Sequence, residues 1–475
     1  MPSVVYFLLS VVALIVGYVV YGRIVERCFG ADEKRATPAQ TMADGVDYVA
    51  MSPAKVFLVQ LLNIAGVGPV FGPILGALYG PWALVWIVIG SIFAGGVHDY
   101  FSGMLSVRSN GTSIPDVVGN NLGNAFKHFM RYFSVLVLVL VGVVFVSAPA
   151  GLLAKLTPEW MSMQVWIGVI FAYYFIATIL PIDKIIGRIY PLFAIVLIVM
   201  AVGLSGALIF KGYDFYPAAE FVNQHPSDLP IWPLMFVTIA CGAISGFHAT
   251  QSPMMARCLS NEKLGRPVFY GAMIAEGFIA LIWATLGMTF YHTPELLNTA
   301  LANGGPGAMI NEVSVTLLGP IGGLLAILGV IALPITSGDT AFRSARLTIA
   351  DMFGVKQVGN MSRLAIAVPL FVIGAAISMV DFSILWRYFG WANQTLATIV
   401  LWTAAAYLVR RRVAHWIASI PATFMTAVVV SYICFAGIGF GLSQEISSII
   451  GVVVAVACLG LFLARRSAFE ANPVD

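Results

Sequence analysis

Charged residues are scarce in this sequence, and cysteine occurs in no pattern that would indicate a metal site or a disulfide framework. Only 10% of the 475 residues are charged, whereas soluble proteins carry about 25%. The five cysteines form no CxxC pair and show no spacing of metal ligands. The formal net charge of +3 is too small to indicate a nucleic-acid partner. These absences exclude most soluble classes, and we expect no cofactor, no metal site and no nucleic acid.

Long apolar runs make up most of the chain, which is 60% hydrophobic. A helix needs about 20 apolar residues to cross a bilayer, and about thirteen windows of the sequence meet that condition. They lie near residues 3–22, 55–79, 82–106, 131–153, 163–181, 188–210, 231–257, 267–291, 316–340, 363–381, 386–409, 414–438 and 446–464. The first window has no leading basic patch and no cleavage site, so we expect a retained helix and not a signal peptide. The predicted fold class is an all-α polytopic membrane protein.

The distribution of basic residues predicts how these spans are oriented. Alternate connections along the chain carry most of them, including Arg23, Arg108, Arg257, Arg363, Arg410 and Arg465. Only Lys155, Lys211 and Arg387 fall on the opposite side. Because cytoplasmic loops are enriched in Lys and Arg, we expect the N-terminus outside and the C-terminus in the cytoplasm. Tryptophans near span ends, such as Trp386, are expected to anchor the protein at the membrane surface.

Two spans break in the middle on glycine and proline. They are residues 55–80, with the sequence KVFLVQLLNIAGVGPVFGPILGALYG, and residues 231–258, with IWPLMFVTIACGAISGFHATQSPMMARC. A helix in lipid must satisfy its own backbone groups, so a break is tolerated only where it faces protein or a wet cavity. Paired breaks in corresponding positions of two halves indicate the substrate site of a secondary transporter.

The same two breaks predict the domain organisation. Their spans start five spans apart and therefore cross the membrane in opposite directions, which indicates a 5+5 inverted repeat. We expect a single transporter domain over residues 1–475. It comprises an extra helix at 3–22, a five-helix repeat at 54–210, an inverted repeat at 231–410 and two C-terminal helices at 414–464.

Candidate substrate-binding residues lie at the two breaks and in the eleventh span. Glycine lets a ligand approach the backbone closely, and proline frees a carbonyl group by removing an N–H. Close packing of helices through small residues is the alternative, but the presence of a partner break favours a binding site. The candidates are Gly66, Gly68, Pro69 and Gly72 in the first break, Gly242, Ser245, Gly246, His248, Gln251 and Ser252 in the second, and Asn393 and Gln394. His248 could also carry a proton near neutral pH. A core role for His248, bonded to a carbonyl, and a helix-joining role for the two amides stay open.

Three carboxylates and two hydroxyls are candidates for ion coupling. They are Asp99, Glu276, Asp339, Thr336 and Ser337. An intramembrane carboxylate indicates function by default, because its burial is costly. Nearby arginines would hold Asp99 and Asp339 ionised, and Asp339 with Arg343 has the i, i+4 spacing of a plain ion pair. Glu276 has no basic residue within four positions, so we expect it to carry a proton. Alternatively, Thr336 and Ser337 would bind a sodium ion with carbonyls near Gly66.

At these positions the chain resembles the carbon starvation protein A (CstA) family of bacterial inner-membrane transporters. The matching segments are DGVDYV at 44–49, IAGVGPVFGPILG at 64–76, the region of Asp99, RSNGTSI at 108–114, ACGAISGFHA at 240–249, NEK at 261–263, YGAMIAEGF at 270–278, SGDTAFRSAR at 337–346 and FGWANQTLA at 389–397. The resemblance implies the LeuT-like fold and ion-coupled import of peptides or of small carboxylates such as pyruvate during carbon starvation. The chain is shorter after FGWANQTLA than the long members of the family, so the two groups need not share a substrate.

We therefore expect a secondary transporter with a small-molecule substrate, a coupling cation (H⁺ or Na⁺) and contact with membrane lipid. Proton symport is favoured, because the chain offers several intramembrane titratable groups. A sodium-coupled amino-acid or peptide symporter is the alternative. An intramembrane enzyme is disfavoured because no motif such as HExxH is present, and a nutrient sensor because no soluble signalling domain is appended. Whether two protomers form a homodimer stays open.

Overall fold

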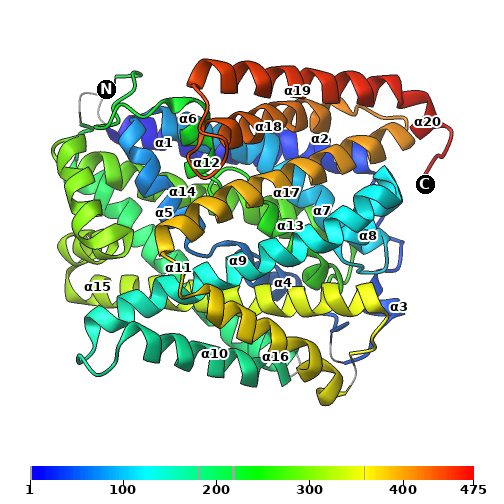
Figure 1. Ribbon diagram of the computed structural model, residues 1–475, viewed down its shortest axis with the longest axis horizontal. Helices are drawn as coiled ribbons and strands as arrows, with labels where there is room; N and C mark the ends of the chain where they lie inside the picture. The colour runs from blue at the N-terminus through cyan, green and yellow to red at the C-terminus, as the bar shows by residue number, and fades with distance from the viewer. Residues whose placement is uncertain (1–2, 46, 180–181, 217–219, 358, 475) are drawn as a thin grey trace.

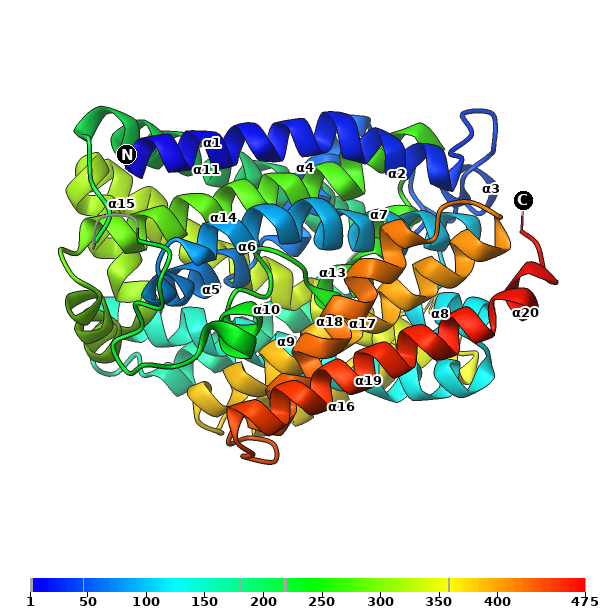
Figure 2. The same ribbon diagram turned by 90° about the horizontal axis from the view of Figure 1, so that it is seen from above.

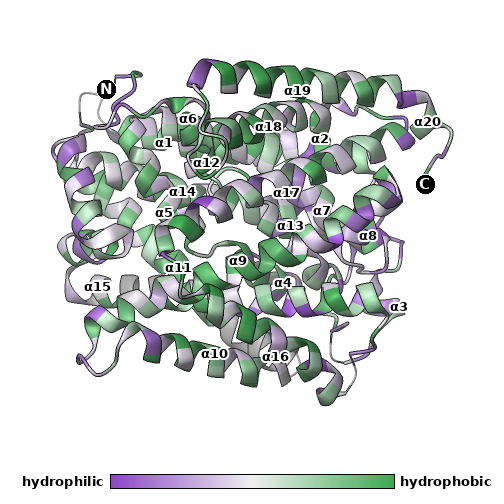
Figure 3. Cartoon of the chain, viewed as in Figure 1, coloured by the Kyte–Doolittle hydropathy of each residue, from purple (hydrophilic) through white to green (hydrophobic). Residues whose placement is uncertain are grey.

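The regular secondary structure of the protein is helical in the ranges that its computed structural model describes. These are residues 3–45, 47–179, 182–216, 220–357 and 359–474, and no strand occurs within them. The long helices run roughly along one axis, and the two termini lie at opposite ends of the bundle (Figure 1, Figure 2). Hydrophobic residues cover most helical surfaces, whereas hydrophilic ones concentrate towards the two ends (Figure 3). This is the pattern of a polytopic membrane protein.

Nine helical stretches within the described ranges are long and apolar enough to cross a membrane. They are formed by α1 to α2 (Ser3–Val16, η1 Gly17–Tyr21, Gly22–Phe29), α6 to α7 (Trp82–Ile89, η3 Gly90–Gly95, Gly96–Arg108), α9 (Asn124–Leu156), the later part of α11 (Ile182–Lys211), η5 to α14 (Glu262–Leu264, η6 Arg266–Tyr270, Gly271–Phe290), α16 (Asn360–Ile377), α17 (Phe382–Arg410), α18 (Trp416–Phe435) and α19 (Gln444–Ala464). Short helices α3 (Pro38–Thr41), α8 (Ile114–Leu122) and α20 (Arg466–Glu470) lie in connections or at the C-terminal end.

A tenth span is a bent pair, α4 (Pro53–Ile64) with α5 (Gly68–Gly76) and η2 (Ala77–Tyr79). The other three predicted spans fall on the shorter apolar helix α10 (Met163–Ile179), on the second broken segment, and within α15 (Pro294–Phe353). The polytopic all-helical class is confirmed in this way, while the count of thirteen and the division into repeats stay predictions.

The helix α15 extends beyond both ends of the predicted span 316–340. Gly305 and Gly319 adopt φ values of 69° and 71° inside it, and each is followed by a proline. Glycine at positive φ ends one helical segment and proline is suited to begin the next, so α15 is three segments in sequence. The predicted span 316–340 begins near the second kink. The two helical segments before that kink lie between the predicted spans 267–291 and 316–340, where no span was predicted.

Burial separates the interior spans from the peripheral ones. In the apolar windows of α14 and α17, 83% of residues are buried, but only 22% in the first span and in α19. Figure 2 accordingly shows α1 and α19 at opposite outer edges of the bundle, with α7 and α13 (Gly246–Ala256) between them. The interior spans are the ones that surround the two breaks.

Candidate transport site

The first predicted break is present. α4 ends at Ile64, α5 begins at Gly68, and the two are bent by 49° across residues 65–67. Pro69 lies in the first turn of α5, where its missing N–H costs no hydrogen bond. The break therefore coincides with the start of the predicted range Gly66–Pro69, while Gly72 lies within the resumed helix.

The second predicted break is also present, and it is longer. η4 (Ile231–Met235) and α12 (Phe236–Thr238) lead into seven non-helical residues, 239–245, before α13 begins at Gly246. The prediction of an unwound region at Gly242–Gly246 is confirmed. The segment frees backbone groups on both sides, which other helices must satisfy.

The two breaks lie against each other. A side chain at Gly68 would overlap Cys241, and a Cβ at Gly72 would lie 2.8 Å from the carbonyl oxygen of Thr238. At one end of the pair Met51 N donates to Cys258 O (3.2 Å). The start of the first broken span thus lies beside the end of the second, which supports the opposite directions predicted from the sequence.

Replacing Gly72 with alanine is expected to abolish transport. The new methyl group would meet the Thr238 backbone carbonyl, which cannot move without shifting the second break. Gly206→Ala is the matched control, because nothing lies within 4 Å of the Cβ it would add. Substrate counterflow into proteoliposomes measures both variants. Normal counterflow by Gly72→Ala would mean that contact between the breaks is not needed.

Four titratable side chains from three helices meet beside the second break. His98 and Asp99 come from α7, His248 from the first turn of α13 and Glu276 from α14, and all four are fully buried. The two oxygens of Asp99 contact different imidazoles, Nδ1 of His98 at 2.7 Å and Nδ1 of His248 at 2.9 Å. We call these four residues the buried cluster.

The other ring nitrogen of His248 faces Glu276. Nε2 lies 3.2 Å from Oε2, which is ion-pair distance, but the two groups lack the alignment of a hydrogen bond. Neither Glu276 oxygen forms a hydrogen bond with any described residue. A neutral imidazole has one donor and one acceptor. Contact with two carboxylates therefore requires an imidazolium or a protonated carboxyl, so the cluster must store at least one proton.

The cluster corrects one expectation and adds a neighbour that the sequence did not indicate. Asp99 was expected to be held ionised by a nearby arginine, but the groups that contact its carboxylate are imidazoles. Glu276 has no basic neighbour on its own helix, yet α13 brings His248 to it. Sequence reasoning also omitted His98 from the candidates, although its position next to Asp99 in an apolar span was a usable signal.

The two amides of α17 hold the backbone of the second broken span. Asn393 Oδ1 accepts hydrogen bonds from Phe247 N (2.6 Å) and from Ser245 Oγ (3.2 Å). Gln394 Nε2 donates to the carbonyl oxygen of Phe236 at 2.6 Å. These contacts satisfy groups that the unwinding freed, which is the helix-joining alternative for both residues. A direct contact with substrate stays a prediction for them.

Among the remaining candidates of the second break, Ser252 contacts the buried cluster, and the others contact their own helix or neighbouring segments. Ser252 Oγ donates to His248 O (2.9 Å) and lies 3.0 Å from Ser102 Oγ. Gln251 Nε2 donates to Thr250 Oγ1 at 3.0 Å. The carbonyl of Gly242 accepts from Ser91 Oγ at 3.1 Å. A side chain at Gly246 would overlap the backbone of α17, so this glycine serves close packing.

The hydroxyl pair of α15 lies on the other side of the first break. Ser337 Oγ donates to the carbonyl oxygen of Leu62 at 3.1 Å, and a Cβ at Gly66 would lie 3.3 Å from it. Thr336 Oγ1 donates to Leu333 O within its own helix (2.8 Å). Asp339 is buried on α15 and does not belong to the buried cluster. The expected contact between a hydroxyl and the carbonyls near Gly66 is therefore made by Ser337.

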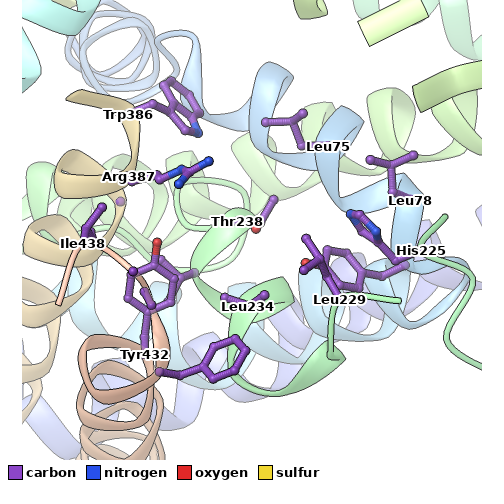
Figure 4. Close-up of a pocket in the computed structure, with 16 residues that line it drawn as sticks. Leu75, Leu78, His225, Leu229, Leu234, Thr238, Trp386, Arg387, Tyr432 and Ile438 are labelled. Atoms are coloured by element: carbon purple, nitrogen blue, oxygen red, sulfur yellow. The ribbon is translucent and has the colours of Figure 1, made fainter. Parts of the chain in front are cut away.

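A cavity of about 480 Å³ leads from the surface towards the breaks, and we call it the vestibule (Figure 4). Leu75 and Leu78 of the first broken span, Leu234 and Thr238 of the second, Trp386 and Arg387 of α17, Tyr432 of α18, and His225 and Leu229 line it. The connection before η4, which provides His225, also contacts the N-terminal helix through the rings of Tyr6 and Phe221. The vestibule thus opens at the end of the bundle where the N-terminus lies.

The path beyond the vestibule is closed. A crevice of about 10 Å³ between Gly68 and Cys241 shares Val237, Thr238, Trp386 and Gly390 with the vestibule. On the other side of the breaks, a cavity near Thr250 and Arg257 measures about 20 Å³. Each has room for about one water molecule. The vestibule was not predicted from the sequence, and Trp386, which lines it, was expected to be a membrane anchor. Arg387 could have indicated the vestibule, because it is one of the few basic residues on the side opposite to most others.

Sequence comparisons relate the chain to known transporters. The family model described as carbon starvation protein CstA matches residues 2–165, 155–303 and 298–432. An uncharacterized membrane protein of Haemophilus influenzae is 46% identical over 350 residues, which cover 63% of this chain and 94% of that protein. The peptide transporter CstA of Escherichia coli is 26% identical over 553 residues, which cover 88% of this chain and 78% of that protein.

Solved structures with a similar fold are also transporters. A manganese transporter of Eremococcus coleocola matches with a TM-score of 0.58 at 12% identity, covering 90% of this chain and 99% of that one. Mhp1, a nucleobase-cation-symport-1 family transporter, matches with a TM-score of 0.52 at 13% identity, covering 88% and 96%. These likenesses concern the fold, which is LeuT-like. In the described part of this chain, no group of three or more His, Cys, Asp or Glu side chains could hold a metal ion.

Proposed function

Since the chain belongs to the carbon starvation protein CstA family, we propose that it is a secondary active transporter that imports peptides or small carboxylates by proton symport across the bacterial inner membrane. That it is a membrane transporter and not an enzyme follows from its family. Relatives named peptide transporter CstA support the substrate class. The role in carbon starvation, the proton and the membrane orientation are part of the proposal.

The buried cluster is the observation that supports proton coupling. His248 lies between Asp99 and Glu276, and it belongs to the first turn after the second break. A proton gained or lost by these groups changes which atoms donate, so the favoured position of α13 relative to α7 and α14 changes with it. Because α13 follows directly from the break that faces Gly68 and Gly72, such a movement would alter the substrate path.

The unequal cavities support alternating access. The vestibule measures about 480 Å³, whereas the cavity near Thr250 and Arg257 measures about 20 Å³. A protein open on one side and closed on the other releases substrate only after a rearrangement that reverses the two. Substrate would therefore move from the vestibule to the crevice between Gly68 and Cys241, and then past α13.

The test is transport by purified protein in proteoliposomes. Labelled dipeptide and labelled pyruvate are offered separately, first in counterflow and then with an inward pH gradient. We expect counterflow of one of them without any gradient, and accumulation of the same substrate when the outside is acidic. Absence of counterflow for both would overturn the substrate class, and counterflow without gradient-driven accumulation would overturn proton coupling.

Sodium coupling is a second candidate, because Ser337 reaches the carbonyl of Leu62 at the first break. Under proton coupling, we expect uptake to continue in sodium-free buffer. Ser337→Ala should slow uptake without abolishing it, because one neutral hydrogen bond contributes about 1 kcal/mol. The measurement is uptake by wild type, Ser337→Ala and Thr336→Val with and without sodium. A strict need for sodium that Ser337→Ala weakens would establish the sodium site instead.

A further inference from the structure

The vestibule has one permanently charged side chain. Among the described residues that line it, Arg387 and His225 are the basic ones, and none is acidic. Arg387 is exposed, and the carboxylate on which its charge acts, that of Asp381 at the N-cap of α17, does not line the vestibule. Burial lowers the pKa of His225 from its ordinary value, so its imidazole is uncharged at neutral pH. Arg387 therefore sets the charge of the vestibule.

The position of Arg387 is unusual for a basic residue of this chain. It is one of three, with Lys155 and Lys211, on the side opposite to most arginines and lysines. Lys155 and Lys211 donate to carbonyl oxygens of α15, Gly304 and Thr316. Arg387 instead extends from the start of α17 into the vestibule, as Figure 4 shows. An anion in the vestibule would give this cation a partner.

The walls around Arg387 are mostly apolar, with three residues that carry hydroxyls. Leu75, Leu78, Leu229, Leu234 and Ile438 surround the cavity (Figure 4). The hydroxyl-bearing residues are Tyr79, Thr238 and Tyr432. Ligand pockets of about 300–1,000 Å³ typically combine apolar walls with a few convergent polar groups. A cavity of about 480 Å³ suits a solute with one anionic end and an apolar body.

We propose that the vestibule recognises carboxylate solutes that carry an apolar side chain, and that Arg387 binds the carboxylate. This deepens the proposed function and rests on it. Guanidinium binds carboxylate through two parallel hydrogen bonds, which distinguishes it from a neutral amide. The vestibule and the crevice at Gly68 and Cys241 share lining residues, so a solute held by Arg387 already lies beside the two breaks.

The experiment compares the dipeptide Ala-Leu with its C-terminal amide in wild type and Arg387→Gln. Wild type is expected to prefer the free acid. Arg387→Gln should raise KM for the acid about tenfold or more and remove the preference, because a charge-assisted hydrogen bond is lost. Arg387→Lys should restore part of it. Lys155→Gln is the matched control, because it removes a charge from the same side outside the vestibule and should leave KM unchanged.

Binding to the purified protein separates this inference from the proposed function. At one fixed concentration, Ala-Leu should raise the thermal midpoint of wild type and of Glu276→Gln more than that of Arg387→Gln. Pyruvate has little apolar surface and should bind about tenfold more weakly. An Arg387→Gln variant that still prefers acid over amide, or that Ala-Leu stabilises as much as wild type, would overturn the inference and leave proton symport intact. If wild type binds Ala-Leu but shows no uptake driven by the pH gradient, only the proposed function is overturned.

Discussion

Replacing Glu276 with glutamine is expected to abolish uptake driven by a pH gradient while exchange of substrate stays measurable. Glutamine has nearly the shape of glutamate but cannot take up and release a proton, so the group beside His248 Nε2 would no longer change its charge. An inward gradient of one pH unit supplies about 1.4 kcal/mol for each proton carried, or tenfold accumulation. In the variant this accumulation should fall to about onefold, because substrate and proton are uncoupled. Uptake and counterflow on one preparation measure both effects.

The matched control for this change is Glu312→Gln. Glu312 is exposed and accepts a hydrogen bond from the Tyr291 hydroxyl, far from the buried cluster in sequence and environment. It should leave uptake and exchange unaltered. The elution profile of each variant checks folding. Gradient-driven uptake at the wild-type rate by Glu276→Gln would make Glu276 structural, and Asp99 and His248 would then be the next residues to test.

Replacing Glu262 with glutamine is expected to destabilise the protein by about 3–5 kcal/mol, the cost of leaving one charge of a buried pair without its partner. Glu262 is fully buried, and its two oxygens lie 3.1 Å from Nε and Nη2 of Arg108, whose side chain is 9% exposed. The same carboxylate accepts from Asp32 N at 2.8 Å. Arg108 also donates to Gly30 O and lies over the ring of Phe29. This pair therefore joins the end of the first span to α7 and to the connection after α13.

Thermal unfolding of the purified protein measures this effect. Glu470→Gln is the matched control, because its pair with Arg466 is exposed on both sides and contributes less than about 1 kcal/mol. We expect a large fall in the midpoint for Glu262→Gln and almost none for Glu470→Gln. Equal midpoints for the two variants would show that Arg108 is satisfied by Gly30, Tyr407 and water once the carboxylate is removed.

The roles assigned from the sequence separated residues that the structure brings together. His248 was grouped with the substrate-binding residues, with proton carriage as another role, and Glu276 with the coupling residues, because each was considered within its own span. α13 and α14 place them 3.2 Å apart. Asn393 was grouped with substrate ligands, with helix joining as the alternative, and in the folded chain it accepts a hydrogen bond from the backbone of Phe247. The sequence locates polar residues within apolar spans, but the order of the spans contains no information on which helix faces meet.

The sequence alone determined the membrane class and the positions of both breaks. These are local properties, since apolar length decides whether a helix can span a bilayer and glycine with proline decides where it unwinds. Only the tertiary structure decided the contact of the two breaks, the buried cluster and the direction of Arg387 into the vestibule. Each of these depends on side chains from separate helices, and their distances follow from how the helices pack and not from the order of residues along the chain.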